Sequence, residues 1–227
     1  MPRAYLNKVV GTGPDMKLRD QAYDSFTDNL LSRKILPGQF ITQRELSALT
    51  GMPLGAIREL IPRLEADGLL KTVPQRGMQI THIDLELIRN AFQLRYILEM
   101  EAAAQFALNA TDEQRADLEK SHQDILDQAE HGITDALVEQ AQNVDWAFHD
   151  TLIDHLQNKL VSDVYRVNTI KIRLIRQELT RIVPDIVLSV IGEHMKIIAA
   201  LNTRDPEQAK AALGAHIKGS RVRALNP

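Results

Sequence analysis

Asp145 and His149 are the two residues whose types and spacing point most directly to chemistry. They lie four residues apart in a stretch with helical periodicity. On a helix, side chains at this spacing lie one above the other, so the carboxylate and the imidazole could bind one metal ion. Such pairs also occur as surface pairs or as histidines satisfied within a core. The pair alone leaves both interpretations open.

Two further histidines, His194 and His216, lie on two other predicted helices separated by one short connection. If a bundle brings the three helices together, three imidazoles and one carboxylate form a site suited to Zn, Ni, Co, Mn or Fe(II), and zinc is our first expectation. The chain has no cysteine, which excludes thiolate metal sites, disulfides and thiol catalysis. Imidazole must be neutral to coordinate, so we expect the site to weaken as the pH falls toward about 6.5.

A metal-dependent hydrolytic enzyme is the alternative, with the metal activating water and Glu193 as general base. Neighbouring helical residues diverge by about 100°, which places Glu193 and His194 poorly for action on one water. The chain has no nucleophile elbow, phosphate loop or dinucleotide fingerprint. We therefore expect that this protein is not an enzyme. The histidines for which no partner pattern is apparent are expected at exposed or capping positions: His82, His122, His131 and His155.

The composition indicates a globular protein of one large or two small domains. The chain has 227 residues, of which 44% are hydrophobic and 25% charged. No apolar run approaches the roughly 18 residues that span a bilayer, and no signal peptide is apparent, so we expect a cytoplasmic protein without membrane contact. Residues 1–83 carry eleven Lys and Arg against eight Asp and Glu, whereas the remainder has a net charge of −6. The basic segment favours a polyanionic partner.

Residues 16–82 show the pattern of a winged helix-turn-helix domain that follows a tail, residues 1–15. Helices are predicted over 16–35, 42–51 and 53–67, the second with Thr42 and Glu45 in capping-box spacing. Pro62 inside the third predicts a local distortion. Two short strands, 69–73 and 78–80, form the wing. The third helix would enter the DNA major groove, and the cations available to that surface are Arg44, Arg58, Arg63 and Arg76.

Residues 83–227 predict an all-helical domain. The helices fall at 84–109, 112–131, 133–157, 160–181, 184–202 and 206–222. Six helices of this length suit an antiparallel bundle. The predicted fold class is therefore mainly α: an N-terminal winged helix-turn-helix plus a C-terminal all-α antiparallel helical bundle.

Two groups of motifs resemble a known family. LPGQFITQREL at 36–46, IRELIPRLEADGLL at 57–70 and QRG at 75–77 resemble the DNA-binding domain of GntR-type bacterial transcription regulators. The C-terminal part resembles the FCD ligand-binding domain of the FadR-like subfamily, in its six-helix, VanR-like branch. Its R-x-x-x-E and D-x-x-F-H patterns and its two later histidines fit Arg95 with Glu99, Asp145 with Phe148 and His149, and then His194 and His216.

The resemblance implies a homodimeric regulator that binds operator DNA and whose helical domain binds a small carboxylic acid, often beside a divalent metal. Arg44, Arg58 and the wing-tip pair Arg76 and Gly77 fall where family members contact DNA. The chain departs from the family at the start of the third helix, where residues 53–56 read PLGA in place of a basic, hydroxyl-rich S-R-T-P. That change bears on operator sequence, because each good bidentate base contact contributes about 1–3 kcal/mol of discrimination.

Arg95 is our candidate for the acid's carboxylate, because a guanidinium binds a carboxylate with two hydrogen bonds. An ion pair with Glu99, four residues on, is the equal alternative. Arg173, Arg176 and Asn168 are further candidates for lining the ligand pocket, and Tyr165 is a candidate for an additional polar contact. A third function also stays open, in which the helical domain only dimerises and its metal is structural. In that case metal removal would lower the melting temperature without changing DNA or ligand affinity.

Overall fold

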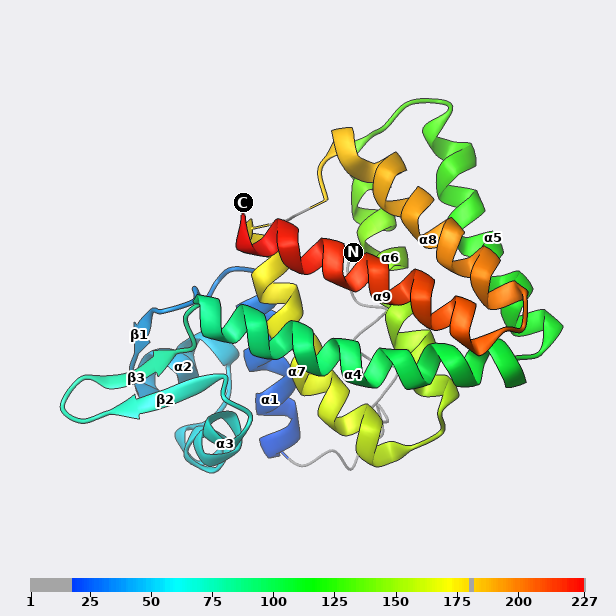
Figure 1. Cartoon of the computed structure of the whole chain (residues 1–227). Helices are drawn as coiled ribbons and strands as arrows, with labels where there is room; N and C mark the ends of the chain where they lie inside the picture. The colour runs from blue at the N-terminus through cyan, green and yellow to red at the C-terminus, as the bar shows by residue number, and fades with distance from the viewer. Residues whose placement is uncertain (1–17, 180–181, 227) are drawn as a thin grey trace. The chain divides into compact units, whose positions relative to one another are not determined.

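The computed structural model describes residues 18–179 and 182–226, where helices dominate and one small sheet is present (Figure 1). These residues form two compact units. The N-terminal unit comprises residues up to Leu87 together with Thr169–Ile175, and the helical unit comprises Ile88–Asn168 and the residues from Arg176 onward. The predicted fold class is confirmed, while the predicted tail lies outside the described residues.

The N-terminal unit contains the three helices and the wing expected from the sequence. Its elements are α1 (Leu18–Leu31), β1 (Phe40–Ile41), α2 (Gln43–Thr50), α3 (Leu54–Ala66), β2 (Leu70–Val73) and β3 (Gly77–Ile80). The strands form an antiparallel sheet in the order β1-β3-β2, with Phe40 opposite Gln79 and Leu70 opposite Ile80. The two-residue strand β1 is too short for its alternation to be detected in the sequence, and it was not predicted. The core of this unit also includes Ile170 and Leu174 of the helix α7 (Lys159–Leu179), whose residues 169–175 belong to this unit.

The start of α2 and the continuity of α3 follow from the contacts of particular residues. The backbone N–H of Glu45 donates to Thr42 Oγ1 at 3.2 Å and that of Thr42 to Glu45 Oε2 at 2.7 Å, which completes the predicted capping box of α2. Pro62, by contrast, does not end the helix: α3 continues through it to Ala66. Proline removes one backbone donor, but here Leu60, Ile61 and Leu64 remain buried around it and hold the turn in place.

The helical unit contains the six helices predicted for it. They are α4 (Leu85–Asn109, whose first three residues belong to the N-terminal unit), α5 (Asp112–Ala129), α6 (Asp135–His155), α7 (Lys159–Leu179), α8 (Val187–Asn202) and α9 (Pro206–Leu225), with a short 3₁₀ turn, η2 (Pro184–Ile186), before α8. Helix α8 packs against α5, α6 and α9, and α5 also packs against α6 (Figure 1). This packing brings α6, α8 and α9 together. In the described residues, no helix has the length and apolar character needed to cross a membrane.

Candidate functional site

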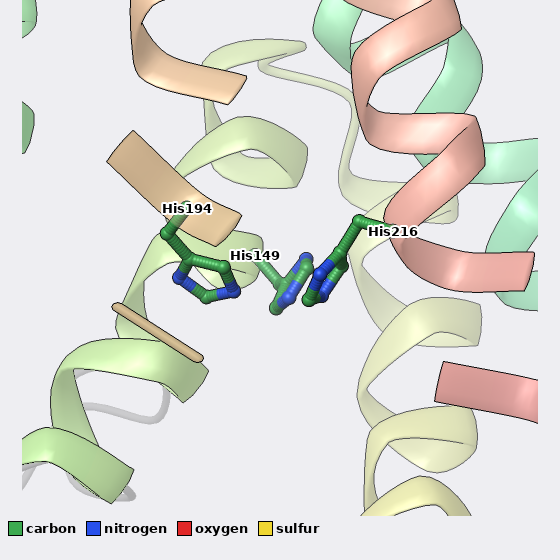
Figure 2. A group of neighbouring side chains, drawn as sticks. All are labelled: His149, His194 and His216. Carbon is green, nitrogen blue, oxygen red and sulfur yellow. The ribbon is translucent and has the colours of Figure 1, made fainter. Parts of the chain in front are cut away.

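Three histidines from three different helices converge in the interior of the helical unit (Figure 2). His149 lies on α6, His194 on α8 and His216 on α9, and all three are buried. One ring nitrogen of each lies within 4.8 Å of the others. The helices on which the sequence placed these residues therefore do meet at one point.

Asp145 completes the predicted set of four. It lies one turn before His149 on α6, and its side chain is fully buried. Its Oδ1 is 3.4 Å from His194 Nε2, while its Oδ2 accepts a hydrogen bond from Arg176 Nη1. Burial would raise the pKa of this carboxyl, but the surrounding positive charges, with that of Arg176 the strongest and Arg95 among the others, together outweigh that effect and lower it. The carboxylate is therefore held ionised.

Carboxylates behind the cluster set the orientation of two imidazoles. His149 Nδ1 lies 2.7 Å from Glu99 Oε2, and His216 Nδ1 lies 2.8 Å from Glu193 Oε2. An ionised carboxylate only accepts, so each Nδ1 carries a proton, and in the neutral ring the lone pair is then on Nε2. Glu193, the general base of the enzyme hypothesis, thus binds the outer side of a histidine.

Four donor atoms in this cluster fit a divalent metal. Among the described residues, Asp145 Oδ1, His194 Nε2 and His216 Nε2 are buried and have no hydrogen-bond partner. Buried polar atoms are rarely left in this state, so their convergence needs an explanation. Imidazole and carboxylate oxygen are the ligands that Zn and its neighbours accept. A metal–nitrogen bond is about 2.1 Å long, so ring nitrogens that lie within 4.8 Å of one another would move inward to share one ion.

Arg95 is buried beside the fourth donor atom, His149 Nε2. Its Nε donates to Glu99 Oε1 at 2.7 Å and its Nη2 contacts His149 Nε2. The predicted ion pair with Glu99 is therefore present, and the guanidinium also reaches the cluster. Tyr165 adds a hydroxyl that donates to Glu99 Oε1 at 2.6 Å.

These contacts shift the pKa values of both partners of Arg95. Burial opposes ionisation of Glu99, but the charge of Arg95 and the bonds from His149 and Tyr165 hold the pKa of this carboxyl well below its usual range. Burial lowers the pKa of His149 to about 4, and the charge of Arg95 acts in the same direction. His149 is therefore neutral, as coordination requires.

The remaining pocket candidates are placed differently. Arg176 binds Asp145, as described above. The amide nitrogen of Asn168 donates to the carbonyl of Ala91 at 3.0 Å, which joins α7 to α4. Arg173 is buried on α7 within the stretch that belongs to the N-terminal unit.

His122 on α5 is the residue that the sequence interpretation missed. It was expected to be exposed or capping, and this was wrong: its side chain is fully buried, and its Nε2 lies 3.1 Å from His194 Nδ1. The signal that could have found it is its spacing, because His122 shares the buried face of α5 with Arg115, Leu118 and Ile125. His82 and His131, by contrast, are exposed as expected.

The proposed DNA surface carries exposed arginines on α2, α3 and the wing. Arg44, Arg58 and Arg76 are exposed. Arg58 Nε lies 3.4 Å from Gln43 Oε1, and the Arg76 guanidinium lies 4.0 Å above the ring of Phe40. Even with these contacts, the guanidinium groups of Arg58 and Arg76 remain exposed at the surface.

Arg63 is more constrained than the other three arginines. Its Nη1 lies 2.9 Å from Asp20 Oδ1, and its guanidinium lies 3.9 Å above the ring of Tyr23. Both partners belong to α1. This cation is exposed but already has an acidic partner within its own unit.

Two family models match the chain. Residues 90–219 match the model described as FCD domain, and residues 18–80 match the model described as bacterial regulatory proteins, gntR family. The first of these covers the candidate metal cluster and the second covers the helix-turn-helix and wing.

Known proteins resemble the chain over most of its length. The HTH-type transcriptional repressor RspR of Escherichia coli strain K12 is 23% identical over 206 residues, which cover 90% of this chain and 88% of RspR. The structure of E. coli McbR/YncC has a TM-score of 0.73 at 19% identity and covers 93% of this chain and 98% of its own. The metal-free FCD domain of TM0439 has a TM-score of 0.51 at 19% identity, covering 63% and 95%. The families and the curated relatives are transcriptional regulators and not enzymes.

Proposed function

Because this chain belongs to the GntR family of bacterial transcriptional regulators and carries an FCD domain, we propose that a small organic acid and a divalent metal, bound in its helical unit, control its binding to operator DNA. The observation that carries the proposal is the cluster of Asp145, His149, His194 and His216, in which three buried donor atoms have no partner among the described residues. Zinc is the first candidate, and Ni, Co, Mn and Fe(II) fit the same donor set.

Arg95 links the metal to the acid in this proposal. Its Nη2 contacts His149 Nε2, the nitrogen whose lone pair would bind a metal. Arg95 and a metal ion therefore compete for this atom, and metal binding frees one edge of the guanidinium. A free guanidinium edge is a strong partner for the acid's carboxylate.

The proposed DNA contacts come from α2, α3 and the wing. Arg44 and Arg58 lie on the helices, Arg76 and Gly77 lie at the wing tip, and Arg63 contributes less because it is paired with Asp20. A homodimer would place two recognition helices on two half-sites of a double-stranded operator. The acid would change the relative populations of dimer forms that fit the two half-sites differently. Since its partner is bacterial DNA, we also propose that the protein works in the cytoplasm.

Recovery of genomic DNA tests this function. Purified protein is incubated with fragmented genomic DNA at moderate salt, and the bound fraction is sequenced. We expect a few sites that share a short inverted repeat, and we expect Arg58→Ala to lose them. Arg221→Ala is the matched control, since it removes the same charge from an exposed position on α9 and should leave recovery unchanged. Uniform recovery by the wild type would contradict sequence-specific regulation.

The role of the metal is tested on a recovered operator. Removal of metal with a chelator should change both operator affinity and the response to carboxylic acids, measured by fluorescence anisotropy of labelled DNA. A lower melting temperature with unchanged DNA and acid binding would instead support a structural metal.

A further inference from the structure

His122 lies against the outer side of the metal cluster, and the proton on its ring can be located from geometry. Its Nδ1 is 2.8 Å from the carbonyl oxygen of Leu118, one turn earlier on α5. A carbonyl oxygen only accepts hydrogen bonds, so Nδ1 carries a proton. Ser121 Oγ, 3.1 Å from the same Nδ1, donates its own proton to Leu118 O and so can also accept. In the neutral ring, Nε2 is therefore the acceptor.

The same reasoning then locates the proton on His194. His122 Nε2 lies 3.1 Å from His194 Nδ1, and because the first atom accepts, the second must donate. A neutral His194 then has its lone pair on Nε2, which faces Asp145 Oδ1 at 3.4 Å. Both rings are fully buried, an environment that disfavours the charged imidazolium.

Phe148 packs against the rings of both His194 and His122. It stacks on the ring of His194 with centroids 4.5 Å apart and meets the ring of His122 edge to face at 5.5 Å. Phe148 lies between Asp145 and His149 on α6, so the same helix supplies two candidate ligands and the ring that packs on a third. Rotation of either imidazole would require Phe148 to move.

We infer that His122 is a positioning residue that selects the tautomer of His194, so that the lone pair on His194 Nε2 faces the centre of the cluster. Without an acceptor at Nδ1, the proton of His194 is better placed on Nε2, where it faces the ionised carboxylate of Asp145, whose Oδ1 is 3.4 Å away. That tautomer directs an N–H group at the position of the metal and removes one ligand. The inference rests on the proposed metal site, in which His149 and His216 are oriented by carboxylates and His194 by a neutral imidazole.

Nitrogen NMR of the metal-free, full-length protein tests this directly. Long-range ¹H–¹⁵N spectra of ¹⁵N-histidine-labelled protein distinguish protonated from unprotonated ring nitrogens, and the His194 signals are assigned from their loss in His194→Gln. In the wild type we expect the proton on Nδ1 and the lone pair on Nε2. In His122→Leu we expect the proton on Nε2. His122→Gln, whose amide oxygen can accept near the position of the lost Nε2, should restore the wild-type tautomer.

His155→Leu is the matched control. His155 also packs edge to face on a phenylalanine, Phe106, with centroids 5.0 Å apart, but the ring belongs to the end of α6. We expect its loss to leave the His194 signals unchanged. A wild-type His194 with its proton on Nε2, or an unchanged tautomer in folded His122→Leu, would overturn the inference. The wild-type result decides the matter even if His122→Leu does not fold.

Titration with Co(II), followed by its visible absorption, separates this inference from the proposed function. Loss of an outer hydrogen-bond partner of a metal-binding histidine typically costs about 10- to 100-fold in affinity. We expect a weakening of that size in His122→Leu, recovery in His122→Gln and none in His155→Leu. Equal Co(II) affinity in all variants would overturn the role of His122 in metal binding. If the wild type binds no Co(II), the proposed metal site fails, while the tautomer spectra still decide what His122 does.

Discussion

His149 illustrates how neighbours determine what a single side chain can do. It is buried between Glu99, which accepts from its Nδ1, and Arg95, which contacts its Nε2. Burial and the nearby guanidinium lower its pKa to about 4, although Glu99 acts in the opposite direction. From the sequence we expected protons to compete for the ligand histidines near pH 6.5. For His149 the structure moves that competition to lower pH.

The stability of the metal-free protein should report this shift. In the unfolded chain His149 takes up a proton near pH 6.5, whereas in the folded chain it stays neutral to about pH 4. The unfolded state therefore binds more protons in this range, and the free energy of unfolding falls as the pH falls through it. Urea unfolding in the presence of a chelator at pH 7.5, 6, 5 and 4.5 measures the slope. His149→Gln should reduce the slope, and His131→Gln, at an exposed position, should not. Equal slopes for the wild type and His149→Gln would contradict the prediction.

Among the elements, the wing depends on one backbone position. Gly77 begins β3 with φ of +89°, and a Cβ placed there would lie 3.0 Å from the carbonyl oxygen of Ile41 in β1. A side chain at this position would press on the strand β1, which pairs with β3 at the next two residues, Met78 and Gln79. Gly77 thus acts in the DNA-binding unit through the shape of the wing, whereas its neighbour Arg76 presents a charge.

Gly77→Ala should destabilise the N-terminal unit more than the same change at Gly51. Both glycines have positive φ, which costs an alanine about 1–2 kcal/mol. At Gly51 nothing lies within 4 Å of the added Cβ, so only that backbone cost applies there. At Gly77 the contact with Ile41 O adds to it. Urea unfolding followed by circular dichroism gives the two free energies, and equal losses would show that β1 moves aside at no cost.

On the scale of the whole molecule, the chain combines a mildly basic DNA-binding part with an acidic helical part. Residues 84–227 have a net charge of −6, yet the candidate metal site within them is buried and provides a single carboxylate among its four potential donors. A divalent cation there would add two positive charges to an interior that already holds Arg95 and Arg176. The ionised side chains of Asp145 and Glu99 pair with these two arginines.

Added metal should stabilise the folded protein by mass action. An ion that binds only the folded state contributes about 2.7 kcal/mol at 100 times its Kd. We therefore expect the melting temperature to rise with Zn or Co concentration and to fall on chelation, as measured by differential scanning calorimetry. His194→Ala should abolish the rise, whereas His131→Ala should retain it. A metal-dependent rise of equal size in His194→Ala would place the ion elsewhere on the chain.

Local patterns in the sequence were sufficient to predict the helices, the wing and the placement of Asp145 and His149 on one helix. Helical periodicity, the Thr42 capping box and the spacing of Asp145 and His149 depend on residues that are close along the chain, so they can be interpreted without a fold. The family resemblance added the bundle that joins His194 and His216 to them. The helix predicted over 53–67 is present as α3 with Pro62 inside it, and Leu60, Ile61 and Leu64 are buried around that residue.

Only the tertiary structure decided what lies behind each candidate ligand. Glu99, Glu193 and His122 bind the outer nitrogens of three histidines that are 50, 23 and 72 residues away along the chain. Such partners meet because helices pack against one another, and no spacing along a single helix encodes them. The types of the candidate ligand residues could therefore be identified from the sequence. Their protonation, and with it their capacity to bind a metal, depends on which side chains the packed helices bring into hydrogen-bond distance.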